Sequence, residues 1–101
     1  MIARHWRGWT KASDAPAYEA LLQEKIFPRL RGITGYRGGY LLRRDRGEEI
    51  EFVVINFFDS MESVRAFAGE DYETAVFEPE AKALLSRFDA KAEHFSVAAK
   101  V

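Results

Sequence analysis

The residues of this chain best suited to acid–base or polar chemistry stand within apolar segments. His94 lies in the closing segment 88–97, and an imidazole can take or give a proton near neutral pH. We predict that His94 faces a cavity as a catalytic base; the alternative is a partly buried histidine satisfied by a carbonyl or carboxylate. Asn56 interrupts the apolar run 50–58, where burying its amide without partners would cost about 1–3 kcal/mol. This amide therefore needs either a ligand or a hydrogen-bond partner on a neighbouring element.

Four aromatic side chains accompany these polar residues as candidates for substrate binding. They are Trp6, Phe58, Phe67 and Tyr72. An indole or phenol donor in a cavity suits an aromatic ligand, whereas core filling is the more common fate of such side chains. We predict that all four contact a small aromatic or hydrophobic molecule.

The composition argues against several other kinds of site. The chain has no cysteine, which excludes disulfides, thiolate nucleophiles and thiolate metal sites. His5 and His94 lack a patterned set of carboxylates, and the glycines of GITGYRGG lack the context of a phosphate loop. We therefore expect neither a metal nor a cofactor. A net charge of −1 gives no electrostatic footprint for nucleic acid or an anionic membrane.

No apolar run approaches the length of a membrane span, and MIARHWRGW lacks the continuous apolar core of a signal peptide. We therefore expect a cytoplasmic protein without a membrane partner. The length of 101 residues suits one domain, 1–101, with one hydrophobic core.

Hydrophobic periodicity predicts the strands and helices that must position these residues. Alternation predicts strands at 2–9, 36–44, 50–58 and 88–97, with a hairpin turn at 45–47. Four-residue spacing from Tyr18 to Leu30 predicts a helix that Ser13 or Asp14 caps. Pro28 is expected to kink this helix or to end its regular part near Phe27. Helices are also predicted at 61–68, after a cap at Asp59 or Ser60, and from Pro79 to Leu85, with 70–77 helical or irregular. Gly38 and Gly39 predict a bulge or a close approach within the second strand.

The order βαββαβ predicts an α+β, ferredoxin-like fold, in which helices cover one face of a four-stranded antiparallel sheet. The other face carries apolar residues that a monomer would expose. We therefore expect a homodimer that packs sheet to sheet about a two-fold axis.

The chain resembles the antibiotic-biosynthesis monooxygenase family of the dimeric α/β-barrel superfamily. The resemblance rests on MIARHWRGW, IFPRLRGITGYRGG, EFVVINFFDSMESVRAFAGEDYETAV and EHFSV, with FFDSMESVRAFAGEDY the most diagnostic. It implies a homodimer with a cavity between sheet and helices in each subunit. It also implies that Asn56 holds a substrate oxygen or a dioxygen-derived intermediate.

Haem-degrading relatives supply an axial histidine after the central strand, but 60–87 contains none, and Phe77 and Glu78 stand about where it would be. Haem degradation by this route is therefore not expected, although His5 or His94 could ligate differently. The leading hypothesis is a cofactor-independent monooxygenase of a small aromatic or quinol-like substrate. The alternative is a non-catalytic, dimeric small-ligand-binding or stress-related protein.

Overall fold

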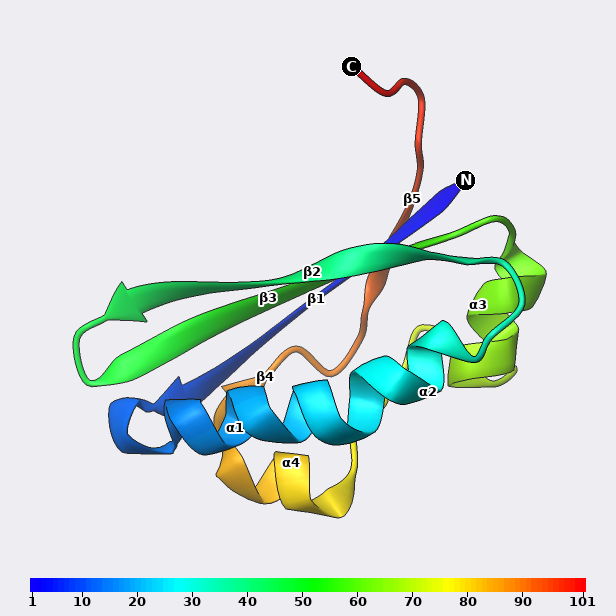
Figure 1. Ribbon diagram of the computed structural model, residues 1–101. Helices are drawn as coiled ribbons and strands as arrows, with labels where there is room; N and C mark the ends of the chain where they lie inside the picture. Colours follow the sequence, from blue (N-terminus) through cyan, green and yellow to red (C-terminus); the bar gives the residue numbers. More distant parts are fainter.

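A computed structural model describes residues 1–101 and shows helices covering one face of an antiparallel sheet (Figure 1). Its elements in chain order are β1 (Ile2–Lys11), the 3-10 turn η1 (Ala12–Asp14), α1 (Ala15–Leu21), the π-helical turn η2 (Leu22–Ile26), α2 (Phe27–Arg31), β2 (Tyr36–Arg46), β3 (Glu49–Phe58), α3 (Met61–Ala68), α4 (Pro79–Leu84), β4 (Leu85–Phe88) and β5 (Glu93–Ser96). The predicted βαββαβ order is confirmed.

The sheet has five strands rather than four, because the last predicted strand is broken in two. The strand order is β2-β3-β1-β4, and β5 also pairs with β1. Strand β4 pairs with the second half of β1, and β5 with its first four residues. A continuous strand at 88–97 was therefore a wrong prediction. Asp89 lies at the break, where its carboxylate accepts a bond from Arg7 Nε at 2.9 Å and its carbonyl accepts one from Trp6 Nε1 at 2.6 Å.

Residues 70–78 form an irregular segment that packs beside this break. The backbone N–H of Ala75 donates to the carbonyl of Ala90, and that of Ala92 donates to the carbonyl of Glu73. An isolated bridge also joins Thr74 and Lys91. The chain between β4 and β5 therefore pairs with this segment instead of continuing along β1.

The helix ends differ in part from the predicted caps. Neither Ser13 nor Asp14 makes a side-chain capping bond, because the helix opens through the η1 turn, where the N–H of Ala15 donates to the carbonyl of Ala12. At α3, Ser60 is the cap and accepts from Ser63 N. The Asp59 carboxylate instead pairs with Arg37, at 2.6 and 2.7 Å.

The β2–β3 hairpin confirms the predicted irregularity at the paired glycines. The register shifts between Tyr36 and Gly39, and a side chain at Gly39 would overlap Asn56 Oδ1 and the Ile55 carbonyl. Only a glycine permits this approach, which brings the β2 backbone directly against the Asn56 amide.

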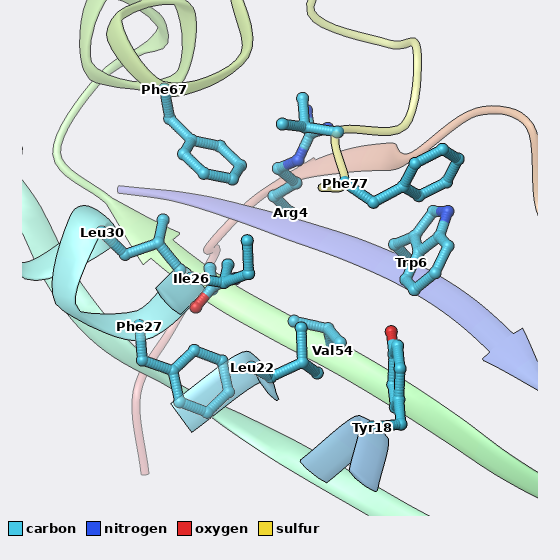
Figure 2. Close-up of a pocket in the computed structure, with 12 residues that line it drawn as sticks. Arg4, Trp6, Tyr18, Leu22, Ile26, Phe27, Leu30, Val54, Phe67 and Phe77 are labelled. Carbon is cyan, nitrogen blue, oxygen red and sulfur yellow. The ribbon is translucent and has the colours of Figure 1, made fainter. Parts of the chain in front are cut away.

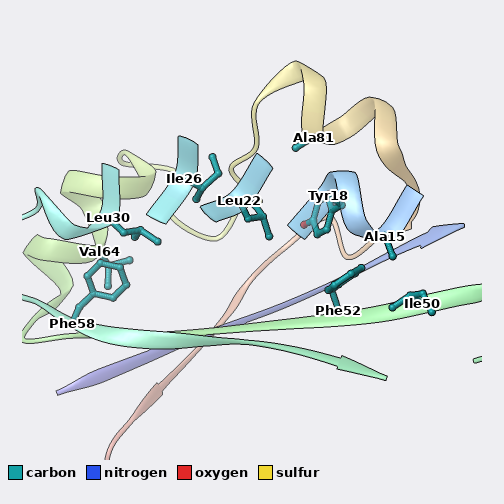
Figure 3. Packing of buried hydrophobic residues seen from close by; sticks show 10 residues of the cluster. All are labelled: Ala15, Tyr18, Leu22, Ile26, Leu30, Ile50, Phe52, Phe58, Val64 and Ala81. Atoms are coloured by element: carbon teal, nitrogen blue, oxygen red, sulfur yellow. The ribbon is translucent and has the colours of Figure 1, made fainter. Parts of the chain in front are cut away.

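The core lies between the helices and the covered face of the sheet (Figure 3). The predicted helical stripe is buried in full, with Tyr18 and Leu30 almost completely inaccessible. The helices contribute Ala15, Tyr18, Leu22, Ile26, Leu30, Val64 and Ala81, and the sheet contributes Ile50, Phe52 and Phe58. This packing fixes which sheet face points inward and therefore which strand residues can meet a ligand.

No helix covers the opposite face of the sheet (Figure 1). Tyr40, Leu42 and Phe95 are 66%, 46% and 54% exposed, respectively. None of the helices combines the length and the apolar character needed to cross a membrane.

Candidate functional site

A row of polar residues crosses the sheet on its helix-covered face. Strand pairing sets His94 of β5 opposite Arg4 of β1, Arg4 opposite Asn56 of β3, and Asn56 opposite Gly39 of β2. Directly paired residues share a sheet face. His94 and Asn56 therefore face the same side, with the Arg4 side chain between them.

A cavity of about 50 Å³ lies between this row and the helix α1–η2–α2 (Figure 2). Its lining is apolar and aromatic apart from a few polar groups: Arg4, Trp6, Tyr18, Leu22, Ile26, Phe27, Leu30, Val54, Asn56, Phe67, Val76 and Phe77. Apolar walls with a few placed polar groups are typical of small-molecule sites. In its present form the cavity has room for a few water molecules.

A second, more open hollow of about 220 Å³ adjoins the cavity. Phe27 and Asn56 border both spaces, and Arg31, Tyr36 and the Gly38–Gly39 bulge complete the hollow. Phe27 directly follows the π-helical turn, and such turns recur at functional sites. The Phe27 ring and the Asn56 amide therefore form the partition between an inner cavity and the molecular surface.

Asn56 is buried and held in a defined orientation. Its Oδ1 accepts a hydrogen bond of 2.7 Å from the Tyr36 hydroxyl. With the oxygen occupied, the amide nitrogen presents two donors that make no bond within the protein. Asn56 can therefore hold an acceptor oxygen of a ligand in the inner cavity.

Arg4 is the most unusual group at the site, because it is 5% exposed and bonds only neutral partners. Nη1 donates to the Tyr72 carbonyl and lies 3.0 Å from His94 Nε2, and Nη2 donates to the Thr74 carbonyl at 3.4 Å. Burial lowers the pKa of the guanidinium to about 10. The site therefore contains a buried positive charge.

His94 lies behind Arg4 and does not border the cavity. Its ring also meets Tyr72 edge-on, with centroids 5.2 Å apart. Burial, and secondly the charge of Arg4, lower the pKa of His94, while Glu73 acts in the opposite direction. The imidazole is consequently neutral at pH 7 and supports Arg4.

The predicted aromatic residues separate into two groups. Trp6 and Phe67 line the cavity, and Trp6 donates its indole N–H to the Asp89 carbonyl. Phe58 is fully buried against Tyr36 and Phe67 and does not reach the cavity, and Tyr72 contacts the site through its carbonyl.

Sequence reasoning missed two polar groups of the site. Arg4 shares a strand face with Trp6 by simple alternation, which was the signal that could have found it. Tyr18 was assigned only to the core, but its hydroxyl points into the cavity and makes no hydrogen bond within the protein (Figure 2). Burial raises the pKa of Tyr18, so the hydroxyl stays protonated and can donate.

No model of a protein family and no curated protein matches the sequence. Solved structures do match over nearly the whole chain. A haem-degrader, MhuD, from Mycobacterium tuberculosis, with two haems bound in its active site, is 20% identical, with a TM-score of 0.67 and coverage of 100% of this chain and 99% of that one.

Two further solved structures match this chain over nearly its whole length. Rv0793 from Mycobacterium tuberculosis is 20% identical, with a TM-score of 0.66 and coverage of 98% and 96% of the two chains. A Bacillus cereus protein, provisionally described as an antibiotic biosynthesis monooxygenase, is 15% identical, with a TM-score of 0.63 and coverage of 99% and 93%. The resemblance expected from the sequence is thus confirmed at the level of the fold.

Proposed function

We propose that the chain is a cofactor-independent monooxygenase of a small aromatic or quinol-like substrate. The observation that carries this proposal is Asn56, whose free amide donors border an aromatic cavity while Tyr36 holds its oxygen. Trp6 and Phe67 would contact the substrate ring. The shared fold with a protein described as an antibiotic biosynthesis monooxygenase supports the same activity class.

The chemistry needs an electron-rich substrate that reacts with dioxygen once it has lost a proton. For an anthrone-like methylene, one oxygen atom becomes the ketone and the other leaves as water with both methylene hydrogens. This balance requires no external reductant. The protein would supply the cavity, exclude water and stabilise the deprotonated substrate.

The proton acceptor for this reaction does not lie at the cavity surface. No carboxylate or imidazole lines the cavity, and His94 lies beyond Arg4. We propose that His94 receives the proton after Arg4 shifts, or that the substrate enters already ionised. Tyr72 and Phe58 would support the walls and not contact the substrate.

Haem fits this site poorly. Neither His5 nor His94 borders the cavity, and Phe77 lines it near the position where relatives supply an axial histidine. A cavity of about 50 Å³ is also far too small for a porphyrin. The proposal therefore uses no haem step.

The same small volume favours a second candidate function, a non-catalytic protein that binds a small ligand. A bicyclic substrate would enter only if Phe27 moved and joined the cavity to the adjacent hollow. A binding protein for a molecule of few atoms would need no such movement.

Oxygen consumption across a panel of anthrone- and quinol-like compounds tests the proposed activity. We expect turnover by the wild type and a loss of about 100-fold in Asn56→Leu, because one donor to a developing oxyanion is removed. Gln23→Leu, the same kind of change at an exposed position of η2, is the matched control and should remain active. If no compound supports oxygen uptake, the monooxygenase proposal is rejected and the non-catalytic binding function remains. Unchanged activity in His94→Ala would show that His94 takes no part in the mechanism.

We also propose that the chain is a cytoplasmic homodimer formed through the uncovered sheet face. The exposed Tyr40, Leu42 and Phe95 support this, because monomers seldom expose contiguous apolar patches. Light scattering at micromolar concentration should give twice the chain mass of 11.6 kDa.

A further inference from the structure

The buried charge of Arg4 has no compensating carboxylate. Nine ion pairs join an arginine or lysine to a carboxylate in the protein, and none includes this side chain. Two carbonyls and a neutral imidazole occupy part of its donor set, while Nε makes no hydrogen bond within the protein. Buried charges are normally paired, so an unpaired guanidinium bordering a cavity indicates an anionic partner from outside the chain.

The other polar groups of the cavity point to the same partner. The Asn56 oxygen is occupied by Tyr36, which leaves the amide N–H groups, and the Tyr18 hydroxyl is free to donate. Trp6 donates its only side-chain N–H to the Asp89 carbonyl. The cavity therefore offers hydrogen-bond donors and one positive charge, and no carboxylate lines it. A cationic ligand would find no carboxylate there, and a neutral donor would find only the Tyr18 hydroxyl oxygen as a side-chain acceptor.

We infer that the cavity binds its ligand as an oxygen anion, a phenolate or a carboxylate on a small ring, with the charged oxygen at Arg4. Because the closed cavity has room for only a few water molecules, the ring enters when Phe27 moves and joins the cavity to the adjacent hollow. The aromatic walls then contact the ring, and Asn56 and Tyr18 donate to the same or a neighbouring oxygen. This assignment rests on the site of the proposed function and specifies the charge of its ligand. It also gives Arg4 a chemical task, which is to lower the pKa of a bound phenol so that no base is needed inside the cavity.

A purely structural role for Arg4 makes a different prediction. The bonds to the carbonyls of Tyr72 and Thr74 anchor the irregular segment 70–78 to β1. An anchor of this kind needs no ligand. In that case the positive charge of Arg4 would not change the affinity of the cavity for an anion. Selectivity for an anion over its neutral isostere separates the two roles.

Calorimetric titration with benzoate and with benzamide, its neutral isostere, provides the first test. We expect the wild type to bind benzoate about 10- to 100-fold more tightly than benzamide, because a charge-assisted bond is lost with the amide. Arg4→Met should lose this preference, and Arg4→Lys should retain part of it. Arg46→Met, an equal change at an exposed position of β2 that does not border the cavity, is the matched control and should bind as the wild type does.

A second test uses the wild type alone, so that it does not depend on the folding of a variant. The absorbance of 4-nitrophenol reports its ionisation, and binding beside Arg4 should lower the pKa of the bound phenol by about 1–3. If 4-nitrophenol binds without this decrease in pKa while benzoate still binds more tightly than benzamide, the site binds carboxylates and not phenolates. Equal affinity for benzoate and benzamide, or no binding of either anion, would overturn the inference.

Neither test measures oxygen uptake, so the two proposals can fail separately. Anion-selective binding without turnover would retain this inference and remove the monooxygenase. Turnover that Arg4→Met leaves unchanged would retain the monooxygenase and remove the anion site.

Discussion

At the scale of single residues, Arg4 and His94 form the pair whose protonation states are coupled. A guanidinium has only donors, so His94 Nε2, 3.0 Å from Arg4 Nη1, must accept and the imidazole proton must sit on Nδ1. Protonation of Nε2 would place two positive charges side by side in a partly buried position. The pair is therefore compatible with a neutral histidine alone.

This arrangement predicts a stability that depends on pH through His94. Its pKa in the folded protein lies below the ordinary 6.5, so the unfolded chain binds the proton more readily. The free energy of unfolding should carry no penalty from His94 above pH 6.5. It should decrease as the pH falls from 6.5 toward the lowered pKa of the folded protein, because the unfolded chain then takes up the proton first. Thermal unfolding between pH 7.5 and 5 would show this decline.

The variant His94→Gln can accept from Arg4 through its amide oxygen but cannot be protonated, so its unfolding midpoint should decline less over the same range. His5→Gln is the control, because His5 lies on the opposite sheet face. Identical declines in wild type and His94→Gln would show that another group controls the effect.

At the scale of elements, the helix α1–η2–α2 contains a proline and still keeps one continuous face in the core. Pro28 has no N–H and cannot donate to a carbonyl one turn back. The π-helical turn widens the helix just before it, where the N–H of Phe27 donates to the carbonyl of Leu22. The helix then continues to Arg31, so Pro28 does not stop the helix, and the interruption of its regular α-helical part is the π-helical turn that ends just before Phe27. Leu30 therefore remains in the core.

The glycine bulge of β2 is the second element that shapes the site, and Gly39→Ala tests it. A Cβ at this position would lie 2.2 Å from Asn56 Oδ1 and 2.4 Å from the Ile55 carbonyl, so the strand must shift. We expect a loss of about 1–3 kcal/mol in the free energy of unfolding, together with weaker ligand binding.

The matched control is Gly32→Ala, where the nearest atom would be 3.5 Å away and the backbone has ordinary helical angles. That substitution should be neutral or stabilising by about 0.4–1 kcal/mol. Urea unfolding of both variants gives the comparison, and equal effects would argue against a special approach at Gly39.

At the scale of the whole molecule, the two faces of the sheet have different surroundings. The helix-covered face carries the row from His94 to Asn56 and the cavity. The uncovered face carries the exposed Tyr40, Leu42 and Phe95. A second copy would bury this apolar surface without obstructing the cavity.

The double variant Leu42→Glu with Phe95→Glu should therefore convert the proposed dimer into a folded monomer. Like charges placed on a self-complementary face would meet across the two-fold axis and oppose association. Light scattering should show the mass falling by half, whereas Lys82→Glu on the exposed side of α4 should leave it unchanged. A wild-type protein that is already monomeric would contradict the interface itself.

The sequence by itself determined the fold class and most of the local elements. The four-residue spacing from Tyr18 to Leu30, the alternation of β1 and the glycine pair of β2 are local patterns, and each appears in the structure as expected. Asn56 was identifiable in the same way, because a polar residue in an apolar strand is visible without any partner.

Only the tertiary structure decided what surrounds those residues. Arg4 and His94 are 90 positions apart. The burial of the imidazole and its contact with Arg4, which together lower the pKa of His94, depend on β5 pairing with β1 in one register. The same holds for Asp89, at the break in the closing strand, which binds Arg7, 82 positions earlier. Hydrophobic periodicity records which side of an element is buried, and it carries no information on which distant side chain lies opposite.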